Sequence, residues 1–466
     1  MTPTPETPEN TSTPPASPAT SLRYVALISI AAAIGGFLFG YDTAVVSGAI
    51  GFLKAHFQLN ADLTGWAASS LLVGCMAGAM LGGPAGDRFG RKPSLIFCAA
   101  LFAASSFFSA TPATLTAFVW ARFAGGLAIG AASMLSPLYI AEIAPEKFRG
   151  RLVALYQLAI VTGILVVFFV NLQIQRMGDD AWNTSTGWRW MFASLVLPSV
   201  LFGVLMSIVP ESPRWLLKAG RREPALRVLT RVGGEHTARR EIDSIETALA
   251  QEQGQGRWRD LFSTGCRRAL IIGVAMAVFQ QFCGINAIMY FAPEIFKTAG
   301  SATDSAFAQT VVVGAVNLAF TLVAIWLVDK LGRKPLLLAG TLLQVIMLGA
   351  VGLMFKTGGG GAMLLVAILG FVASFAMALG PVVWILNSEI FPLKLRGRAM
   401  AVATFFLWFA AWTVTQTFPM LLDRIGAANT FWAYAACSLL CAIFVAAFVP
   451  ETKGRTLEEI EKSWKR

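Results

Sequence analysis

Apolar runs of about 20 residues, each long enough to cross a bilayer as a helix, recur along the whole chain. Short polar breaks separate twelve such runs, with centres near residues 36, 75, 102, 127, 163, 199, 282, 316, 346, 375, 410 and 440. With 56% hydrophobic and only 14% charged residues, the composition is typical of polytopic membrane proteins rather than soluble domains. The sequence therefore predicts an all-α polytopic membrane protein with twelve transmembrane helices.

Basic residues gather in alternate breaks between these runs. The breaks at 88–92, 147–151, 330–334 and 394–398, and the segment 211–268, hold most of the Lys and Arg residues on one predicted face. The loops of the other face hold Lys54, Arg176, Lys297, Lys356 and Arg424. By the positive-inside rule, both termini are cytoplasmic, and we expect a multi-pass protein of the cell inner membrane. The formal charge of +11 then needs no nucleic acid, and we expect none as a partner.

The second part of the chain repeats the first. Three motifs return in the same order at offsets of 242, 247 and 240 residues: GDRFGRKP at 86–93 as VDKLGRKP at 328–335, AEIAPEKFRGR at 141–151 as SEIFPLKLRGR at 388–398, and PESPRW from Pro210 as PETKGR from Pro450. One such match could be chance, but three at nearly one offset predict two homologous six-helix halves of the same orientation.

These repeats divide the chain into five parts. We expect a disordered cytoplasmic tail at 1–21, a six-helix half at 22–210, a cytoplasmic linker at 211–266, a second six-helix half at 267–450 and a cytoplasmic tail at 451–466. The first part is rich in Pro, Thr and Ser and cannot bury a core. In the linker, Ile242, Ile245 and Leu249 fall on one helical face, which predicts short amphipathic helices under the bundle.

One carboxylate, Asp42, interrupts the first apolar run at GGFLFGYDTAVVSG. An acid in the membrane costs roughly 2.5 to 3.5 kcal/mol, so it needs a function or a partner. Arg122 lies at a similar depth in the fourth run, which crosses in the opposite direction. A carboxylate beside Arg stays ionised, whereas one separated from it in an apolar site has a raised pKa. The pair is therefore either a proton switch or a permanent structural ion pair.

Several of these motifs together resemble the sugar porter family of the major facilitator superfamily. They are the two D-[RK]-x-G-R-[KR] loops, R-x-x-x-G at Arg122–Gly126, PESPRW, QQFCGIN at 280–286, GPVVW at 380–384 and PETKGR. The resemblance covers about residues 24–460 and is closest to bacterial proton-coupled xylose, glucose and galactose symporters. It implies the two-half major facilitator fold with alternating access, and it favours proton coupling because the family's proton symporters carry Asp at the place of Asp42.

Amide and aromatic groups suited to sugar hydroxyls and ring faces lie in the seventh run. Gln280, Gln281, Asn286 and Tyr290 cannot all share one rigid helical face, and Gly284 allows a break. The resemblance implies sugar contact by Gln157, Gln280, Gln281, Asn286, Asn317 and Trp384, a cavity lined by Phe39, Phe291, Phe375 and Trp408, and an outer gate at Tyr290. The alternative for buried amides is hydrogen bonding between helices, worth roughly 0.6 kcal/mol each.

Three positions depart from the xylose symporters. Ile164 and Leu407 stand where those proteins carry polar residues, so the cavity is more apolar and xylose is not the assumed substrate. Leu195 stands where they have a carboxylate in the sixth span, which leaves Asp42 to act alone.

The repeated loops also carry acids and bases at helix ends on the cytoplasmic side. We expect a cytoplasmic gate network that forms when the inner side is closed and so biases alternating access, although topology-setting charge is the simpler explanation of the basic residues. Its members are Asp87, Arg91, Glu142, Arg149, Glu211, Arg214, Asp329, Arg333, Glu389, Arg396 and Glu451. Gly380, Pro381 and Pro392 can let the tenth span bend as a gate.

The expected function is secondary active transport, not enzymatic catalysis. No GxxxxGK[ST] phosphate loop appears, so a gradient supplies the energy, and no metal-type CxxC pair appears among the six cysteines. We expect a monomer that carries a monosaccharide such as glucose, galactose or xylose with a proton across the bilayer, without cofactor or metal. A facilitative sugar uniporter and a polyol carrier of the same fold are the alternatives.

Overall fold

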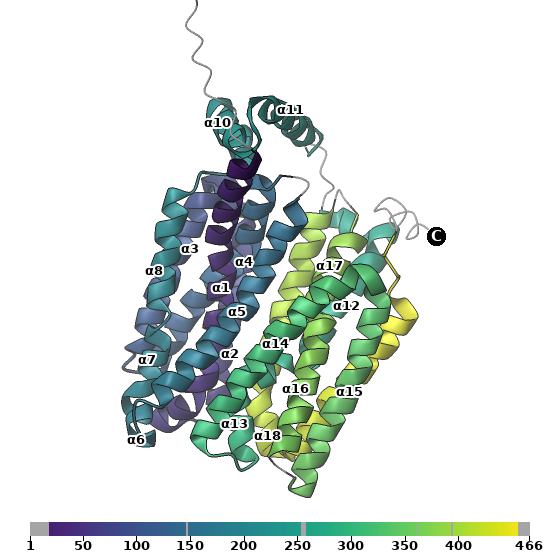
Figure 1. Ribbon diagram of the computed structural model, residues 1–466. Coiled ribbons are helices and arrows are strands. Elements are labelled where there is room, and N and C mark those ends of the chain that lie inside the picture. Colours follow the sequence, from purple (N-terminus) through teal and green to yellow (C-terminus); the bar gives the residue numbers. More distant parts are fainter. Residues whose placement is uncertain (1–17, 146–147, 253–257, 360, 393–394, 455–466) are drawn as a thin grey trace, which may run out of the picture.

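The computed structural model describes residues 18–145, 148–252, 258–359, 361–392 and 395–454, nearly all of them helical (Figure 1). The first five spans are α1 (Pro18–Phe57), α2 (Ala61–Phe89), α3 (Arg91–Ala110), α4 (Leu115–Ile143) and α5 (Arg149–Gln175). The sixth combines α6 (Asp180–Trp182), a π-helical turn η2 (Asn183–Gly187), α7 (Trp188–Ala193) and α8 (Val196–Ile208). The linker contains α9 (Pro213–Lys218), α10 (Arg222–Gly233), α11 (Glu235–Glu252) and η3 (Trp258–Phe262).

The remaining helices form the second half. They are α12 (Thr264–Phe282), α13 (Ile285–Thr298), α14 (Thr303–Leu331), α15 (Arg333–Thr357), α16 (Ala362–Met377), α17 (Leu379–Ile390) and α18 (Arg396–Phe448). By length and composition, 11 helical segments of the described chain could cross a membrane. The last, α18, has 53 residues and consists of two helices joined by a kink at Gly426, where φ is 77°, a value that glycine adopts freely. It therefore supplies two spans, and the predicted twelve-span, all-α architecture is confirmed.

Two helix boundaries differ from the expected division of the chain. Helix α1 begins at Pro18, so residues 18–21, which we expected in the disordered tail, are helical. Proline is well suited to a first helical turn because its missing N–H has no partner there in any case. Helix α12 begins at Thr264, within the expected linker. Residues 1–17 and 455–466, which make up most of the two expected tails, lie outside the described residues.

Each half packs mainly on itself. In Figure 1 the first half, purple to blue, stands beside the second, green to yellow, and α10 and α11 lie at one end of the bundle. We call this the linker end and the opposite one the far end. Within the first half, α2 and α4 approach so closely that a Cβ at Gly74 or Gly126 would collide with backbone oxygens of the other helix. Small residues allow such approach in membrane bundles.

The two halves are joined by polar contacts at the far end. Arg176 at the end of α5 pairs with Asp304 at the start of α14, with Nε to Oδ1 at 2.5 Å. Ser69 of α2 donates to Gln416 Oε1 of α18 at 2.8 Å. The Lys297 ammonium of α13 lies 5.0 Å from the ring centroid of Phe52 in α1. These polar contacts therefore join the two halves at the far end of the bundle.

The linker helices pack on one another through the predicted apolar face. Ile242 is buried with Leu229 and Ala238, and Ile245 packs against this cluster. Leu249 is half-buried on the same helix. Helix α10 also contacts α1, so the linker helices rest on the first half.

Candidate functional site

The seventh span is broken in the middle of its predicted amide motif. Helix α12 ends at Phe282, Gly284 adopts the left-handed conformation with φ 88°, and α13 begins at Ile285. A second distortion lies at Phe291. The break brings the amides together: Asn286 Nδ2 donates to Gln281 Oε1 at 2.8 Å, and Gln281 Nε2 lies 3.4 Å from Gln280 Oε1. The predicted distortion of this span is therefore present.

The tenth span is also broken, and Gln280 binds the break. Ala378 separates α16 from α17 with φ −119° and ψ −86°. Pro381 follows in the first turn of α17, where its missing N–H costs nothing. Gln280 Nε2 donates to the carbonyl oxygens of Leu379 and Gly380 at 2.7 and 3.1 Å. For Gln280 the structure thus shows the hydrogen bond between helices that was the alternative to sugar contact.

The predicted cavity residues are only partly assembled. Phe39 of α1 and Trp408 of α18 meet across the two halves with ring centroids 5.4 Å apart. Trp408 Nε1 is buried without a hydrogen-bond partner among the described residues. Phe291 instead packs on Phe418, at 5.1 Å, and Tyr290 is buried.

The other predicted sugar residues stand apart from the amide cluster. Gln157, Trp384 and Phe375 are half-buried, and Asn317 is buried. Within the described part of the chain, no hydrogen bond joins Gln157 or Asn317 to the amides of the seventh span.

The two predicted membrane charges form one buried pair. Arg122 Nη1 donates to Asp42 Oδ1, and Arg122 Nη2 donates to the Asp42 carbonyl oxygen at 2.9 Å. Both side chains are at most 1% exposed, and the guanidinium carbon lies 5.1 Å from the ring centroid of Phe192. Asp42 Oδ2 and Arg122 Nε have no hydrogen-bond partner among the described residues. One carboxylate oxygen of Asp42 therefore accepts a hydrogen bond from Arg122, and the other is buried without a hydrogen-bond partner among the described residues.

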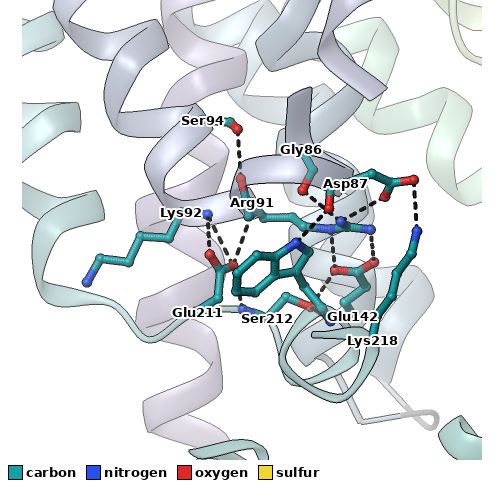
Figure 2. Close-up of polar contacts among 11 residues, drawn as sticks. Gly86, Asp87, Arg91, Lys92, Ser94, Glu142, Glu211, Ser212 and Lys218 are labelled. Atoms are coloured by element: carbon teal, nitrogen blue, oxygen red, sulfur yellow. Dashed lines mark hydrogen bonds and ion pairs between the residues drawn. The ribbon is translucent and has the colours of Figure 1, made fainter. Parts of the chain in front are cut away.

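The linker end of the first half holds a charged cluster around Arg91 (Figure 2). Arg91 pairs with Glu142, Nη2 to Oε1 at 3.0 Å, and with Asp87, Nη1 to Oδ1 at 3.0 Å. Glu211 Oε1 accepts from the backbone N–H groups of Arg91 and Lys92 at 3.1 and 3.2 Å. Burial raises the pKa of Glu211 above its usual value, although these N–H groups favour its ionised form. We call these residues the Arg91 cluster.

The second half repeats this arrangement around Arg333. Arg333 Nη2 lies 2.8 Å from Glu389 Oε1, and Glu451 accepts from the backbone N–H groups of Arg333 and Lys334 at 3.1 and 3.0 Å. Burial also favours the neutral form of Glu451, but backbone donors, Lys453 first among them, outweigh it and lower its pKa. We call these residues the Arg333 cluster.

Several members of the expected cytoplasmic gate network form ion pairs in this structure. Each arginine–carboxylate ion pair of the two clusters lies within one half, because each acid sits on a helix of the same half as its arginine. Asp87 also pairs with Lys218 of the linker helix α9, with Oδ2 to Nζ at 3.0 Å. Arg149 is exposed at the start of α5. Arg396 keeps two buried guanidinium nitrogens without a hydrogen-bond partner among the described residues. Arg214 lies in α9, and the side chain of Asp329 is outside the described part.

Sequence reasoning missed several residues of these clusters. Ser212 donates to Glu142 Oε2 at 2.5 Å, and Thr452 donates to Glu389 Oε2 at 2.6 Å. The signal was available, because the hydroxyl residue follows the Glu in both PES and PET. Lys92 and Lys334 donate to the carbonyl oxygens of Ser207 and Ala446, both at 2.8 Å. In the described residues, no group of three or more His, Cys, Asp or Glu side chains could hold a metal ion.

Comparison with known proteins matches this architecture over nearly the whole chain. Residues 28–464 match the family described as "Sugar (and other) transporter". The arabinose-proton symporter of Bacillus subtilis is 47% identical over 445 residues, covering 95% of this chain and 96% of that protein. The D-xylose-proton symporter of Escherichia coli is 42% identical over 473 residues, covering 95% and 96%.

A solved structure agrees in fold. The inward-open conformation of the xylose transporter from Escherichia coli is 40% identical, covers 94% of this chain and 100% of that chain, and superposes with a TM-score of 0.85. Fold and relatives together define a multi-pass membrane transporter, not an enzyme. The chain belongs to the sugar transporter family of the major facilitator superfamily.

Proposed function

We propose that this protein is a proton:monosaccharide symporter that works by alternating access. The observation that carries the proposal is the buried Asp42–Arg122 pair, in which Asp42 Oδ2 has no partner among the described residues. The related arabinose-proton and D-xylose-proton symporters support proton coupling. An open carboxylate oxygen can take a proton without first breaking the bond that holds the other oxygen.

Protonation of Asp42 changes the strength of its pairing with Arg122. The ionised carboxylate is attracted to the guanidinium in a low-dielectric environment, and the neutral acid is not. The cation left behind keeps the face of Phe192, an aromatic ring that stabilises a positive charge. Loading and release of the proton therefore shift the packing of α1 against α4, and with it the balance between conformations.

We place the sugar beside the broken seventh and tenth spans. Gln281 and Asn286 supply amide donors and acceptors, and Phe39 and Trp408 supply aromatic faces from both halves. The buried, unpartnered Trp408 Nε1 is a donor that a hydroxyl can satisfy. Gln157, Gln280, Asn317, Trp384, Phe291 and Phe375 are the further sugar or cavity residues, with Tyr290 as the outer gate.

The conformation follows from where the halves meet. We infer that the linker end is cytoplasmic, as the distribution of Lys and Arg indicates. Polar contacts between the halves are then on the outer side, and each cytoplasmic cluster belongs to one half. This is the arrangement of an inward-facing carrier, and the match to an inward-open relative supports it.

The test is uptake into proteoliposomes with and without an inward proton gradient. Labelled arabinose, xylose, glucose and galactose are compared for the native protein and for Asp42→Asn, with the exposed Asp423→Asn as the matched control. We expect gradient-driven accumulation of at least one sugar in the native protein and the control. Asp42→Asn should lose accumulation but retain exchange of labelled sugar.

Two other results have definite meanings. Equal, non-accumulating uptake by the native protein and Asp42→Asn would identify a facilitative uniporter and make Asp42 a structural partner of Arg122. Failure of all four sugars, with transport of a linear polyol, would identify a polyol carrier. Gln281→Ala refines the sugar site, because loss of a buried hydrogen-bonding group should raise the KM for sugar while leaving proton binding unchanged.

A further inference from the structure

The open oxygen of Asp42 borders a gap that Gly125 of α4 creates. A Cβ placed on Gly125 would lie 3.1 Å from Asp42 Oδ2 and would collide with Ser105 Oγ of α3. The two oxygens therefore flank the same empty side-chain position. No hydrogen bond joins them in this structure, because Asp42 Oδ2 has no partner among the described residues.

The Ser105 hydroxyl is oriented to accept rather than to donate. It donates its only hydrogen to the Ala121 carbonyl oxygen of α4 at 2.7 Å, and its side chain is buried. A hydroxyl oxygen has two lone pairs, so Ser105 Oγ can still accept a hydrogen bond. An ionised carboxylate has no hydrogen to offer it, whereas a neutral carboxylic acid has one. The gap is therefore suited to the protonated form of Asp42.

We propose that Ser105 is a positioning residue that accepts a hydrogen bond from Asp42 Oδ2 when Asp42 is protonated, and that Gly125 keeps the path between them open. The proposal rests on the proposed function, in which Asp42 carries the proton. A hydronium ion transfers its proton to Oδ2 and leaves as water, and the new O–H bond turns toward Ser105 Oγ while Oδ1 keeps its contact with Arg122. The ion pair with Arg122 weakens, and no other bond breaks.

Three other charged or titratable groups interact with Asp42 among the described residues. Arg122 on α4 holds the other carboxylate oxygen, Cys75 on α2 lies within electrostatic range of both charges, and Tyr290 on α13 does so from the second half. Arg122 stabilises the ionised form of Asp42. Ser105 opposes it by stabilising the neutral form, and the two partners together set the proton affinity.

The test is infrared difference spectroscopy of the purified protein during a pH titration. The carbonyl stretch of a protonated, buried carboxyl group reports its protonation directly, and Asp42→Asn identifies the band by removing it. We expect Ser105→Ala to lower the midpoint of this band by roughly half to one pH unit, because it removes one acceptor of the neutral acid. Ser105→Thr, which keeps the hydroxyl, should restore the native midpoint.

Ser109→Ala is the matched control. Ser109 lies one turn away on α3, is fully buried and has no hydrogen-bond partner among the described residues, so its loss should leave the midpoint unchanged. If Ser105→Ala does not fold, Ser105→Cys, with a weak sulfur acceptor, should shift the midpoint in the same direction. An unchanged or raised midpoint in folded Ser105→Ala or Ser105→Cys would overturn the proposal.

The outcome is separable from that of the proposed function. A native protein that never accumulates sugar, while its Asp42 band shifts in Ser105→Ala, disproves symport and leaves the role of Ser105 intact. If the native protein accumulates sugar but Ser105→Ala leaves the midpoint of the Asp42 band unchanged, symport is supported and the role of Ser105 is disproved.

Discussion

The two halves of this transporter are alike at the linker end and different at the membrane centre. The Arg91 and Arg333 clusters share an arginine paired with a glutamate, a second glutamate on backbone N–H groups and a hydroxyl donor. At the centre, the first half places the Asp42–Arg122 pair, and the second places the amides of Gln280, Gln281 and Asn286.

This difference suggests a structural role for the clusters at the linker end and a transport role for the polar residues at the membrane centre. A repeated sequence needs the same ends to hold its helices together, so the motifs at these ends stayed recognisable in both halves. The centres have different tasks in the proposed mechanism: ions respond to a proton, and neutral amides recognise hydroxyl groups. In that mechanism, the two halves of one repeat bind different substrates, the proton and the sugar.

The largest expected effect comes from breaking the buried Asp42–Arg122 pair of the first half. Arg122→Leu leaves Asp42 buried without its cation, which costs about 3 to 5 kcal/mol when one partner of a buried pair is removed. We expect this loss in the free energy of unfolding, measured by denaturant titration in detergent. The double variant Asp42→Asn/Arg122→Leu should recover most of the loss. A single variant as stable as the native protein would show that the pair contributes nothing to folding.

The next effect compares the two linker-end clusters directly. In the Arg91–Glu142 pair the side chains are 6% and 4% exposed, against 12% and 23% for Arg333–Glu389. Glu142→Gln should therefore destabilise the protein by about 2 to 3 kcal/mol, and Glu389→Gln by about 1 kcal/mol, because solvent compensates the more exposed arginine. Thermal unfolding of both variants under one condition measures the difference. Equal losses would mean that the clusters are equivalent despite their burial.

A smaller effect appears in the pH dependence of stability. The pKa of Glu211 is raised in the folded protein, so its contribution is present below its unfolded pKa and is lost as the pH rises through the folded value. The pKa of Glu451 is lowered, so its contribution is present above its unfolded pKa and is lost as the pH falls through the folded value.

These opposite signs can be measured with two variants. On acidification from about pH 6 to about pH 4, the native protein should gain stability relative to Glu211→Gln and lose it relative to Glu451→Gln. Thermal unfolding at a series of pH values checks both slopes. Slopes of the same sign would show that the two glutamates do not differ in their environments.

The sequence predicted those features that apolar runs, repeated motifs and single exceptional residues encode. The twelve spans, the break at Gly284 and the meeting of Asp42 with Arg122 followed from apolar runs, one glycine and matched depth in the bilayer. The sequence did not reveal that Gln280 binds the carbonyl oxygens of the tenth span, because that contact depends on the exact bend at Ala378.

Contacts between the halves were also beyond sequence reasoning. The acids and bases at the linker end could pair within a half or across the halves, and spacing along the chain does not distinguish the two. The far-end contacts, such as Ser69 with Gln416, join residues that carry no repeated motif. Residues whose partners change during transport are the hardest to assign from one chain.

The smallest expected effect concerns the ion pair that crosses between the halves. Arg176 and Asp304 are 48% and 54% exposed, and such surface pairs are worth about 0 to 1 kcal/mol. A double-mutant cycle of Arg176→Ala and Asp304→Ala should therefore give a coupling energy below about 1 kcal/mol in unfolding experiments, far below that of the Asp42–Arg122 pair.

The two single variants of this cycle should nevertheless change the balance between the inward-facing and outward-facing conformations. In the proposed mechanism this contact is made in the inward-facing state alone and favours that state by its full coupling energy, so even a weak pair shifts the populations severalfold. Accessibility of a cysteine introduced at Gly51, where α1 packs against Glu294 of α13, should rise in both single variants. Charge reversal at both positions, Arg176→Asp with Asp304→Arg, should restore the native value. Unchanged accessibility in the single variants would confine the coupling between the halves to their apolar contacts and to Gln416.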